Sequence, residues 1–302
     1  LEAAIDSFKQ ALKIKPDYAE VHSNMGAALK DKGDLDAAID SYKQALKINP
    51  DYAETHKNMG QVLSEVVFAK PNSDFLEIIT SMLNQKDCVR PRDISKATIS
   101  LLKFEPAIKE LLEIYSSGEL NQSLERTISN LSEVPLLFKL MCLCPLTDLS
   151  LERVFTDTRS ALLLSLSEIS NTPETLRFQS ALALQCFTNE YIYNQTNKEA
   201  KALATLESIV EQTFLKGEQP SPKQILCLAA YKALHDYEWS HLLTVTSDIK
   251  EVHTRQVLEQ KQEIHLKSDI SVLQEITNKV SSKVREQYEA NPYPRWVDVG
   301  LS

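Results

Sequence analysis

The chain has 302 residues, enough for two domains of ordinary size, and its 43% hydrophobic and 25% charged residues are typical of a globular protein. Only six residues are glycine, which favours helices because few positions carry the entropic cost of glycine. The formal net charge of −9 repels phosphate backbones and argues against nucleic acid as a partner. We see no signal peptide and no apolar stretch long enough to span a bilayer, so we expect a cytoplasmic protein with no membrane partner.

The N-terminal part of the chain repeats itself. Residues 1–27 align with residues 35–61 at an offset of 34, and only six of the 27 aligned positions differ. A period of 34 predicts a helix–turn–helix unit that stacks against its own copies.

The repeat resembles the tetratricopeptide-repeat (TPR) family. In the complete repeat, Ala19–Tyr52, the residues that match the family's pattern are small or apolar and end in a proline: Gly26, Leu29, Ala38, Tyr42, Ala45 and Pro50. By this resemblance Gly26 lets the first helix of the repeat approach the second, and Gly33 and Asp34 form the turn between them. His22 and His56 occupy a place where the family often has Trp, so we interpret both as structural.

The repeats in residues 1–63 are a partial, a complete and a second partial unit. The chain opens on the second helix of a repeat, whose apolar face lacks its usual partner. We expect that further repeats precede it in the natural protein, that the following domain completes the array, or that the exposed N-terminal face associates with another copy.

In the TPR family, the first helix of each repeat lines a concave groove that binds a peptide or protein. Asn24 and Asn58 repeat at the same position and resemble the asparagine ladder of O-linked N-acetylglucosamine transferases, in which amides hold an extended peptide backbone. The alternative is a solvated polar face copied by duplication. The predicted peptide-binding residues are Glu20, Ser23, Asn24, Ala27, Lys30, Asp31, Glu54, Lys57, Asn58 and Gln61.

A second, all-α domain is predicted after the repeats. Residues 64–73 form a linker that contains Pro71, and Asp74 is expected to cap the next helix. Helical spacing then continues to residue 290, with no sustained two-residue alternation. The expected helices after the first are 92–102, 105–116, 119–131, 134–143, 148–169, 174–193, 197–216, 221–234, 236–247, 249–263 and 270–290. The helix at 174–193 is apolar on most sides, so we expect it at the centre of this domain.

We predict no catalytic or metal-binding residue. The five cysteines are expected to be buried thiols in a reducing compartment, and Cys142 and Cys144 lack a second ligand pair for zinc. A cluster of His235, Asp236, Glu238 and His241 could suggest a metal. The two histidines are six residues apart and would not share a helix face, so we interpret the cluster as a helix start capped by Asp236.

The tail, residues 291–302, is predicted to be extended. The stretch SSKVREQYEANPYPRWVDVG at residues 281–300 resembles the segment that precedes the catalytic domain of bacterial TPR-containing, S-adenosylmethionine-dependent methyltransferases. The resemblance extends to Asp74–Leu83 with Arg90 and Pro91, and to the runs at 182–191 and 229–239, so it covers nearly the whole chain, although only the tail motif is specific. It implies that five tail residues would contact that domain: Arg285, Tyr288, Tyr293, Arg295 and Trp296.

The chain itself lacks what such an enzyme needs. None of its six glycines forms a G-x-G, so no loop lets the backbone approach the cofactor, and we expect no cofactor in this chain. S-adenosylmethionine is expected only in a full-length parent. The leading hypothesis is therefore a non-catalytic, protein-binding scaffold region of a methyltransferase. The alternative is a free-standing TPR adaptor, and the tail motif argues against a glycosyltransferase or sulfotransferase parent.

Overall fold

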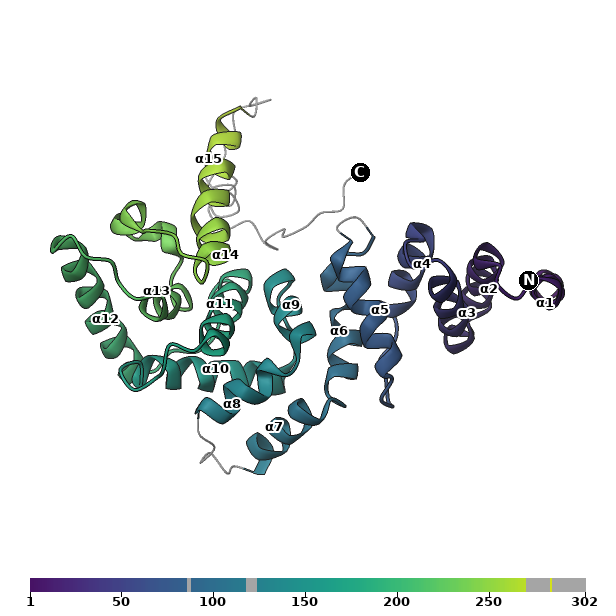
Figure 1. Cartoon of the computed structure of the whole chain (residues 1–302), viewed down its shortest axis with the longest axis horizontal. Coiled ribbons are helices and arrows are strands. Elements are labelled where there is room, and N and C mark those ends of the chain that lie inside the picture. Colours follow the sequence, from purple (N-terminus) through teal and green to yellow (C-terminus); the bar gives the residue numbers. More distant parts are fainter. Residues whose placement is uncertain (86–87, 118–123, 270–282, 284–302) are drawn as a thin grey trace. The chain divides into compact units, whose positions relative to one another are not determined.

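The computed structural model describes residues 1–85, 88–117, 124–269 and 283, and over these ranges it is helical with no strand (Figure 1). This confirms the predicted all-α class. The described chain divides into two compact units, with the boundary in the sequence between Leu111 and Leu112. Each unit is considered by itself below. None of the described helices is both long and apolar enough to cross a membrane.

The repeats form α1 (Glu2–Ile14), α2 (Ala19–Lys32), α3 (Leu35–Ile48) and α4 (Ala53–Leu63). The turn between α2 and α3 is short because Gly33 can end the first helix and Asp34 can cap the second. Gly33 has a φ of 86°, in the left-handed region that favours glycine, and ends α2. The Asp34 carboxylate then accepts a hydrogen bond from the Ala37 N–H, at 3.2 Å, and caps α3. The turn is as predicted.

Close packing of α2 on α3 depends on Gly26. A Cβ atom at this position would lie 2.7 Å from ring carbons of Tyr42, nearer than real Cβ contacts allow. Tyr42, Ala38 and Ala45 of α3 are fully buried at this contact. The predicted role of Gly26 is thus confirmed. Gly60 repeats it on α4, where a Cβ atom would overlap the Val89 side chain.

Helical packing in the first unit continues past the repeats with α5 (Ser73–Asn84) and α6 (Pro91–Leu102), while α7 (Pro106–Ser117) runs into the second unit. Asp74 does not cap α5 as expected. Asn72 occupies the cap position without a side-chain hydrogen bond, and Asp74 lies in the first turn. There its carboxylate lies 3.8 Å from the ammonium of Lys43, and its charge favours the positive helix end.

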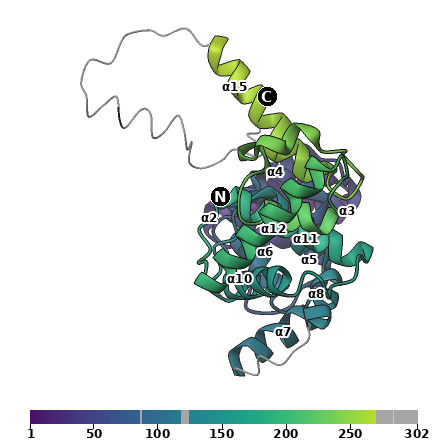
Figure 2. The same ribbon diagram turned by 90° about the vertical axis from the view of Figure 1, so that its left-hand side faces the viewer.

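The second unit is built around α11. Its helices are α8 (Leu124–Ser132), α9 (Pro135–Leu143), α10 (Leu149–Leu164), α11 (Pro173–Thr188), α12 (Asn197–Leu215) and α13 (Pro222–Ala229). Every residue of α11 from Phe178 to Thr188 is buried except Ser180, and the helix packs against α8, α9 and α13. In Figures 1 and 2, α12 lies beside α10. The prediction that this helix forms the centre is confirmed, although it ends at Thr188 rather than at 193.

A buried charge network holds the loop after α11. Arg159 and Glu199 are each 2% exposed, with 3.7 Å between guanidinium and carboxylate. Arg159 also donates to the carbonyl oxygen of Asn194 at 2.8 Å, and Tyr231 donates its hydroxyl to Glu199 at 2.7 Å. Because both charges have several partners, much of the cost of burying them is offset and the loop is fixed to α10 and α12, although the Nε–H of Arg159 has no acceptor among the described residues.

The segment predicted as a helix at 236–247 is different. It forms two short 3₁₀ helices, Leu234–Asp236 and Glu238–Leu242, followed by a non-helical stretch. Tyr237 between them is extended and carries no side-chain cap, so Asp236 does not start a helix here. Both Tyr237 and Trp239 are 6% exposed. In an extended backbone, the side chains of residues i and i+2 point to the same side, so Tyr237 and Trp239 can be buried together. In an α-helix, residues i and i+2 point to different sides.

The last described helix is longer than predicted at 249–263. It runs through α14 (Lys250–His253), a π-helical turn (Thr254–Leu258) and α15 (Glu259–Asp269). The Gln256 side chain within the π turn donates to the carbonyl oxygen of Ala229 at 3.1 Å and accepts from the Leu234 N–H at 3.0 Å. The predicted helix at 270–290, apart from Lys283, and the predicted extended tail lie outside the described residues.

Candidate functional site

The predicted groove residues lie on two consecutive first helices of repeats, α2 and α4. Most of them offer side-chain surface to a ligand. The exposed or half-buried members are Glu20, Asn24, Ala27, Lys30, Asp31, Glu54, Lys57, Asn58 and Gln61. The face therefore combines amides with charges of both signs.

Ser23 is the exception, since it is only 2% exposed. Its hydroxyl accepts a hydrogen bond from the Thr55 hydroxyl at 2.9 Å, so Ser23 joins α2 to α4 inside the packed unit. The Thr55 partner was not among the predicted residues. It lies 32 positions along the chain rather than 34, so the repeat period does not indicate this pair. Ser23 thus contributes to packing between the helices and not to the exposed face.

A second bond joins the two helices at the surface. The Lys30 ammonium donates to the Gln61 side-chain oxygen at 2.7 Å. Both residues were predicted to contact a peptide, and the structure shows them contacting each other. This bond uses one of the three N–H donors of Lys30 and one of the two lone pairs of the Gln61 oxygen, so both side chains keep capacity for a ligand.

The side-chain amides of Asn24 and Asn58 make no hydrogen bond within the described part of the chain. Asn24 is exposed and Asn58 is half-buried. Each amide offers two N–H donors and an acceptor oxygen, the set that pairs with the N–H and C=O groups of an extended backbone. The two positions with this free capacity therefore belong to equivalent places on successive repeats.

The two repeat histidines hold the loops that enter these helices. The Nε2 atom of His22 lies 2.9 Å from the carbonyl oxygen of Pro16, and Nε2 of His56 lies 2.7 Å from that of Pro50. Because a carbonyl oxygen only accepts, Nε2 must carry the hydrogen in both rings. The structural role predicted for both histidines is confirmed, and neither ring faces a ligand as a free base at Nε2.

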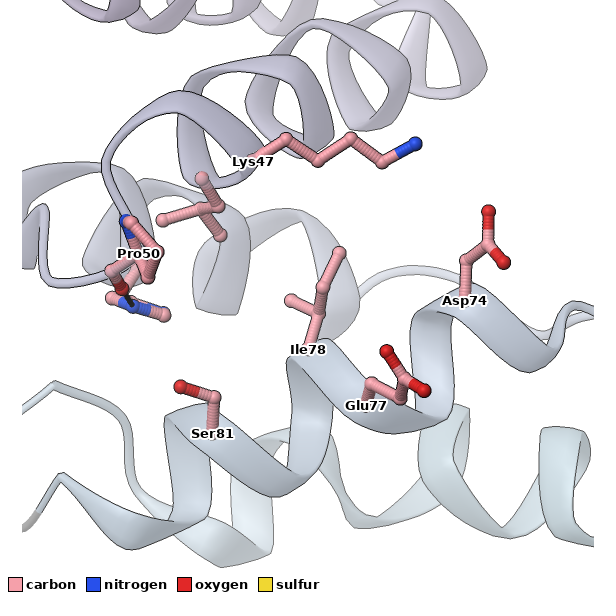
Figure 3. Close-up of a pocket in the computed structure, with 8 residues that line it drawn as sticks. Lys47, Pro50, Asp74, Glu77, Ile78 and Ser81 are labelled. Atoms are coloured by element: carbon pink, nitrogen blue, oxygen red, sulfur yellow. Dashed lines mark hydrogen bonds between the residues drawn. The ribbon is translucent and has the colours of Figure 1, made fainter.

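A small pocket lies between α3 and α5 (Figure 3). Its volume is about 280 Å³. Ile78 points into it from α5, between Glu77 and Ser81, and Lys47 extends over it from α3. The lining combines one ammonium with two carboxylates and includes no nucleophile paired with a base. The full lining is Leu46, Lys47, Pro50, His56, Asp74, Glu77, Ile78 and Ser81.

Three of the five cysteines are unsuited to nucleophilic chemistry. Burial raises the pKa of the Cys142, Cys186 and Cys227 thiols to about 12, so they stay protonated at neutral pH. No cysteine among the described residues forms a disulfide. No group of three or more potential metal ligands lies together in the described ranges either.

The five tail residues predicted to contact a catalytic domain, Arg285, Tyr288, Tyr293, Arg295 and Trp296, lie outside the described residues. Their predicted role stays a prediction.

The stacked helix pairs, the glycine at their contact and the polar face on successive first helices define the N-terminal part as a helical-repeat segment. A family model described as TPR repeat matches residues 1–33 and 28–66. Residues 1–66 are therefore similar to TPR repeats, the family that the period of 34 indicated. No curated protein matches the chain.

Proposed function

We propose that the chain is a protein-interaction scaffold in which the face of α2 and α4 binds an extended peptide segment. The observation that carries this proposal is the pair of unpaired amides, Asn24 and Asn58, at equivalent positions of two repeats. An extended peptide has a regular series of backbone donors and acceptors. Amides that recur at one position of each repeat match such a series.

The chain offers a matched control for this proposal. Gln10 and Gln44 are also separated by 34 residues, carry the same functional group and are exposed, but they lie on the second helices, α1 and α3. Replacing either pair with alanine removes two amides from the repeat surface. Only the α2 and α4 pair lies on the proposed peptide face.

The test is a selection of binding peptides from a random displayed library with the unaltered chain, followed by affinity measurement with the variants. We expect Asn24→Ala/Asn58→Ala to weaken the selected peptides by about fivefold to a hundredfold, since each lost amide costs about 0.5–1.5 kcal/mol. Gln10→Ala/Gln44→Ala should change the affinity less than twofold. Equal weakening by the two double variants would show that the peptides do not use the proposed face.

We further propose that this scaffold belongs to an S-adenosylmethionine-dependent methyltransferase. The support is the resemblance of residues 281–300 to the segment that precedes the catalytic domain in that family. The residues of this chain do not fit the cofactor, because no two glycines form the G-x-G that its binding loop needs. Cofactor binding and methyl transfer would therefore be supplied by sequence outside these 302 residues.

Two measurements test this second proposal. The gene is expected to encode a β-strand and a glycine-rich loop after Ser302, and a chain extended through that region should bind S-adenosylmethionine in a calorimetric titration. The 302-residue chain should show no binding in the same titration. An extended gene product with no such loop would contradict the proposal and leave the TPR adaptor.

A further inference from the structure

Carboxylates lie on both sides of the free amides of the α2 and α4 face. On α2, Glu20 lies one turn before Asn24, and Asp31 lies two turns after it. Glu54 and Glu65 occupy the equivalent places around the amide of α4, 34 residues further along. Residues spaced by four and by seven positions share one side of a helix, so acid, amide and acid follow one line on each helix.

These carboxylates form two rows across the helices. The first row is Glu20 and Glu54, and the second row is Asp31 and Glu65. All four are exposed, and none makes a side-chain hydrogen bond or an ion pair among the described residues. Asp31 and Glu54 act on one group from successive helices, because burial and then these two charges raise the pKa of Tyr42 to about 12. A ligand that lies across both helices therefore meets both rows.

Helix stability explains the first row but not the second. The first row lies in the first turns of α2 and α4, where the positive helix end favours an acid. The second row lies at the opposite ends, where an acid is disfavoured and a base is favoured. One repeat later Lys30 is replaced by Ser64, and α4 has no base in its last turn, yet the acid next to it remains as Glu65. The second row thus needs an explanation outside the helix itself.

The bases of the face leave it negative. The Lys30 ammonium reaches the Gln61 side-chain oxygen at 2.7 Å, so one cation lies between the two helices. Lys57 is one residue before Asn58 and is turned about 100° around α4 from the amide. The lines through the two amides carry the four acids and no base of their own.

The two rows correspond to the two sides of an extended peptide. Successive side chains of an extended backbone point in opposite directions. A backbone held by Asn24 and Asn58 therefore directs alternate side chains toward the first row and toward the second. At 1.5 Å of rise per residue, the rows lie about 6 Å and about 10 Å from the amides along the helices. These distances suit the long side chains of lysine and arginine.

We propose that the peptide bound by the α2 and α4 face is basic, with lysine or arginine side chains on both sides of the backbone segment that Asn24 and Asn58 hold. One set of cations lies beside the first row, and the other set lies beside the second row. The inference rests on the proposed peptide-binding function and names the class of peptide that this face takes, since complementary charge selects among peptides that offer the same backbone groups.

The test uses the 302-residue chain and three fluorescein-labelled probes in anisotropy titrations at about 0.15 M salt. Each probe is a peptide of four identical units, which are Ser-Lys-Lys, Ser-Gln-Gln or Ser-Glu-Glu. The units place the same side chain on both sides of an extended backbone and differ in charge. We expect the lysine probe to bind at least about fivefold more tightly than the glutamine probe, and the glutamate probe to bind most weakly.

Variants then place the recognition on the two rows. Glu20→Gln/Glu54→Gln removes the first row, and Asp31→Asn/Glu65→Gln removes the second. Each double variant should weaken the lysine probe about three- to tenfold, because it removes two partly screened attractions. Neither should weaken the glutamine probe. Circular dichroism would show that the variants keep their helices.

The chain offers a matched control for the loss of charge. Asp6 and Asp40 are also separated by 34 residues and exposed, but they lie on the second helices, α1 and α3. Asp6→Asn/Asp40→Asn removes the same two charges from the repeats and should weaken the lysine probe less than about twofold. Weakening equal to that of the row variants would mean that the probe responds only to the net charge of the chain, which would overturn the inference.

The remaining outcomes separate this inference from the function on which it rests. Asn24→Ala/Asn58→Ala should also weaken the lysine probe. If it does and the row variants do not, peptide binding stands and the preference for basic peptides falls. If only the row variants weaken the probe, it binds by charge without the amides, and both proposals fall. Equal binding of the three probes, or no binding of the lysine probe at millimolar chain, rejects the basic preference, while the library selection still tests peptide binding.

Discussion

The Nε2 atom of His56 lies 2.7 Å from the carbonyl oxygen of Pro50, and the same bond joins His22 to Pro16 one repeat earlier. Each bond connects the first turn of a helix to the loop that ends the previous one. His56 is 1% exposed, whereas His22 is half-buried. The same contact therefore exists in two degrees of burial within one chain.

This difference gives a graded prediction. His56→Ala should lower the free energy of unfolding by about 2–3 kcal/mol, because it removes a buried hydrogen bond and leaves a cavity. His22→Ala should cost about 1 kcal/mol, since water can replace part of the bond at this half-buried site. Urea unfolding followed by circular dichroism measures both. Equal costs at the two sites would contradict the role assigned to burial.

The contact between Gly26 and Tyr42 gives a second prediction. Gly26→Ala should destabilise the repeats by about 1–3 kcal/mol, because its methyl group would overlap the Tyr42 ring. The better helix propensity of alanine offsets part of this cost. Tyr42→Leu removes the overlapping ring atoms, so the cost of Gly26→Ala should be smaller in that background. A double-mutant cycle in urea measures this coupling, and strict additivity would exclude the overlap as the cause.

The buried pair of Arg159 and Glu199 gives a third prediction. Arg159→Met should destabilise the second unit by about 3–5 kcal/mol, since it leaves the Glu199 carboxylate buried without its countercharge. Adding Glu199→Gln should recover part of that loss, because the remaining partner is then neutral. Thermal or urea unfolding of the single and double variants tests this order. A double variant less stable than Arg159→Met would contradict it.

The Glu199 carboxyl also makes the stability of the protein depend on pH. Burial alone raises the pKa of Glu199, but hydrogen bonds from Thr196 and Tyr231 and the charge of Arg159 outweigh it, and the pKa falls below 4.5. A folded-state pKa below the unfolded value means that the stabilisation is complete above about pH 4.5 and is lost as the pH falls through the folded pKa. Unfolding free energies between pH 3 and 6 should therefore show a shallower slope for Glu199→Gln than for the unaltered chain. Identical slopes would assign the acid sensitivity to other groups.

Thiol reactivity provides a fifth test. Cys186 and Cys227 are 0% and 4% exposed, and burial raises the pKa of both thiols to about 12. At pH 8 they should not react with a disulfide reagent in the native chain, but all five cysteines should react in denaturant. Cys186→Ser and Cys227→Ser should leave the native thiol count unchanged. A drop in that count would show that the second unit opens more readily than its burial indicates.

The sequence predicted the repeats well because their contacts recur with the period. Gly26 against Tyr42 and the turn at Gly33 and Asp34 involve residues whose types are dictated locally, by a steric limit and a positive φ. The burial of Ser23 could not be predicted in this way. It depends on a hydrogen bond from Thr55, which lies 32 residues further along the chain and so does not follow the period of 34.

The second unit was harder to predict for a related reason. Tyr237 and Trp239 stand in a stretch whose composition suits a helix, and only their shared burial against α12 favours the extended backbone between the 3₁₀ turns. Phe214, which stacks on Trp239, is distant in the sequence. Periodicity describes one segment at a time, so it could not indicate the stacking of Phe214 on Trp239.

The recurrence of the histidine–proline bond has a consequence for how such a chain can grow. Because the junction at Pro16 and His22 repeats at Pro50 and His56, the segment Ala19–Tyr52 begins and ends on the same contact. A duplicated copy inserted after Tyr52 would meet its neighbours through contacts that already exist at both ends. The array can therefore be lengthened by whole copies of this segment without a new interface between helices. Duplication of the segment is the simplest way in which arrays with different numbers of repeats could arise.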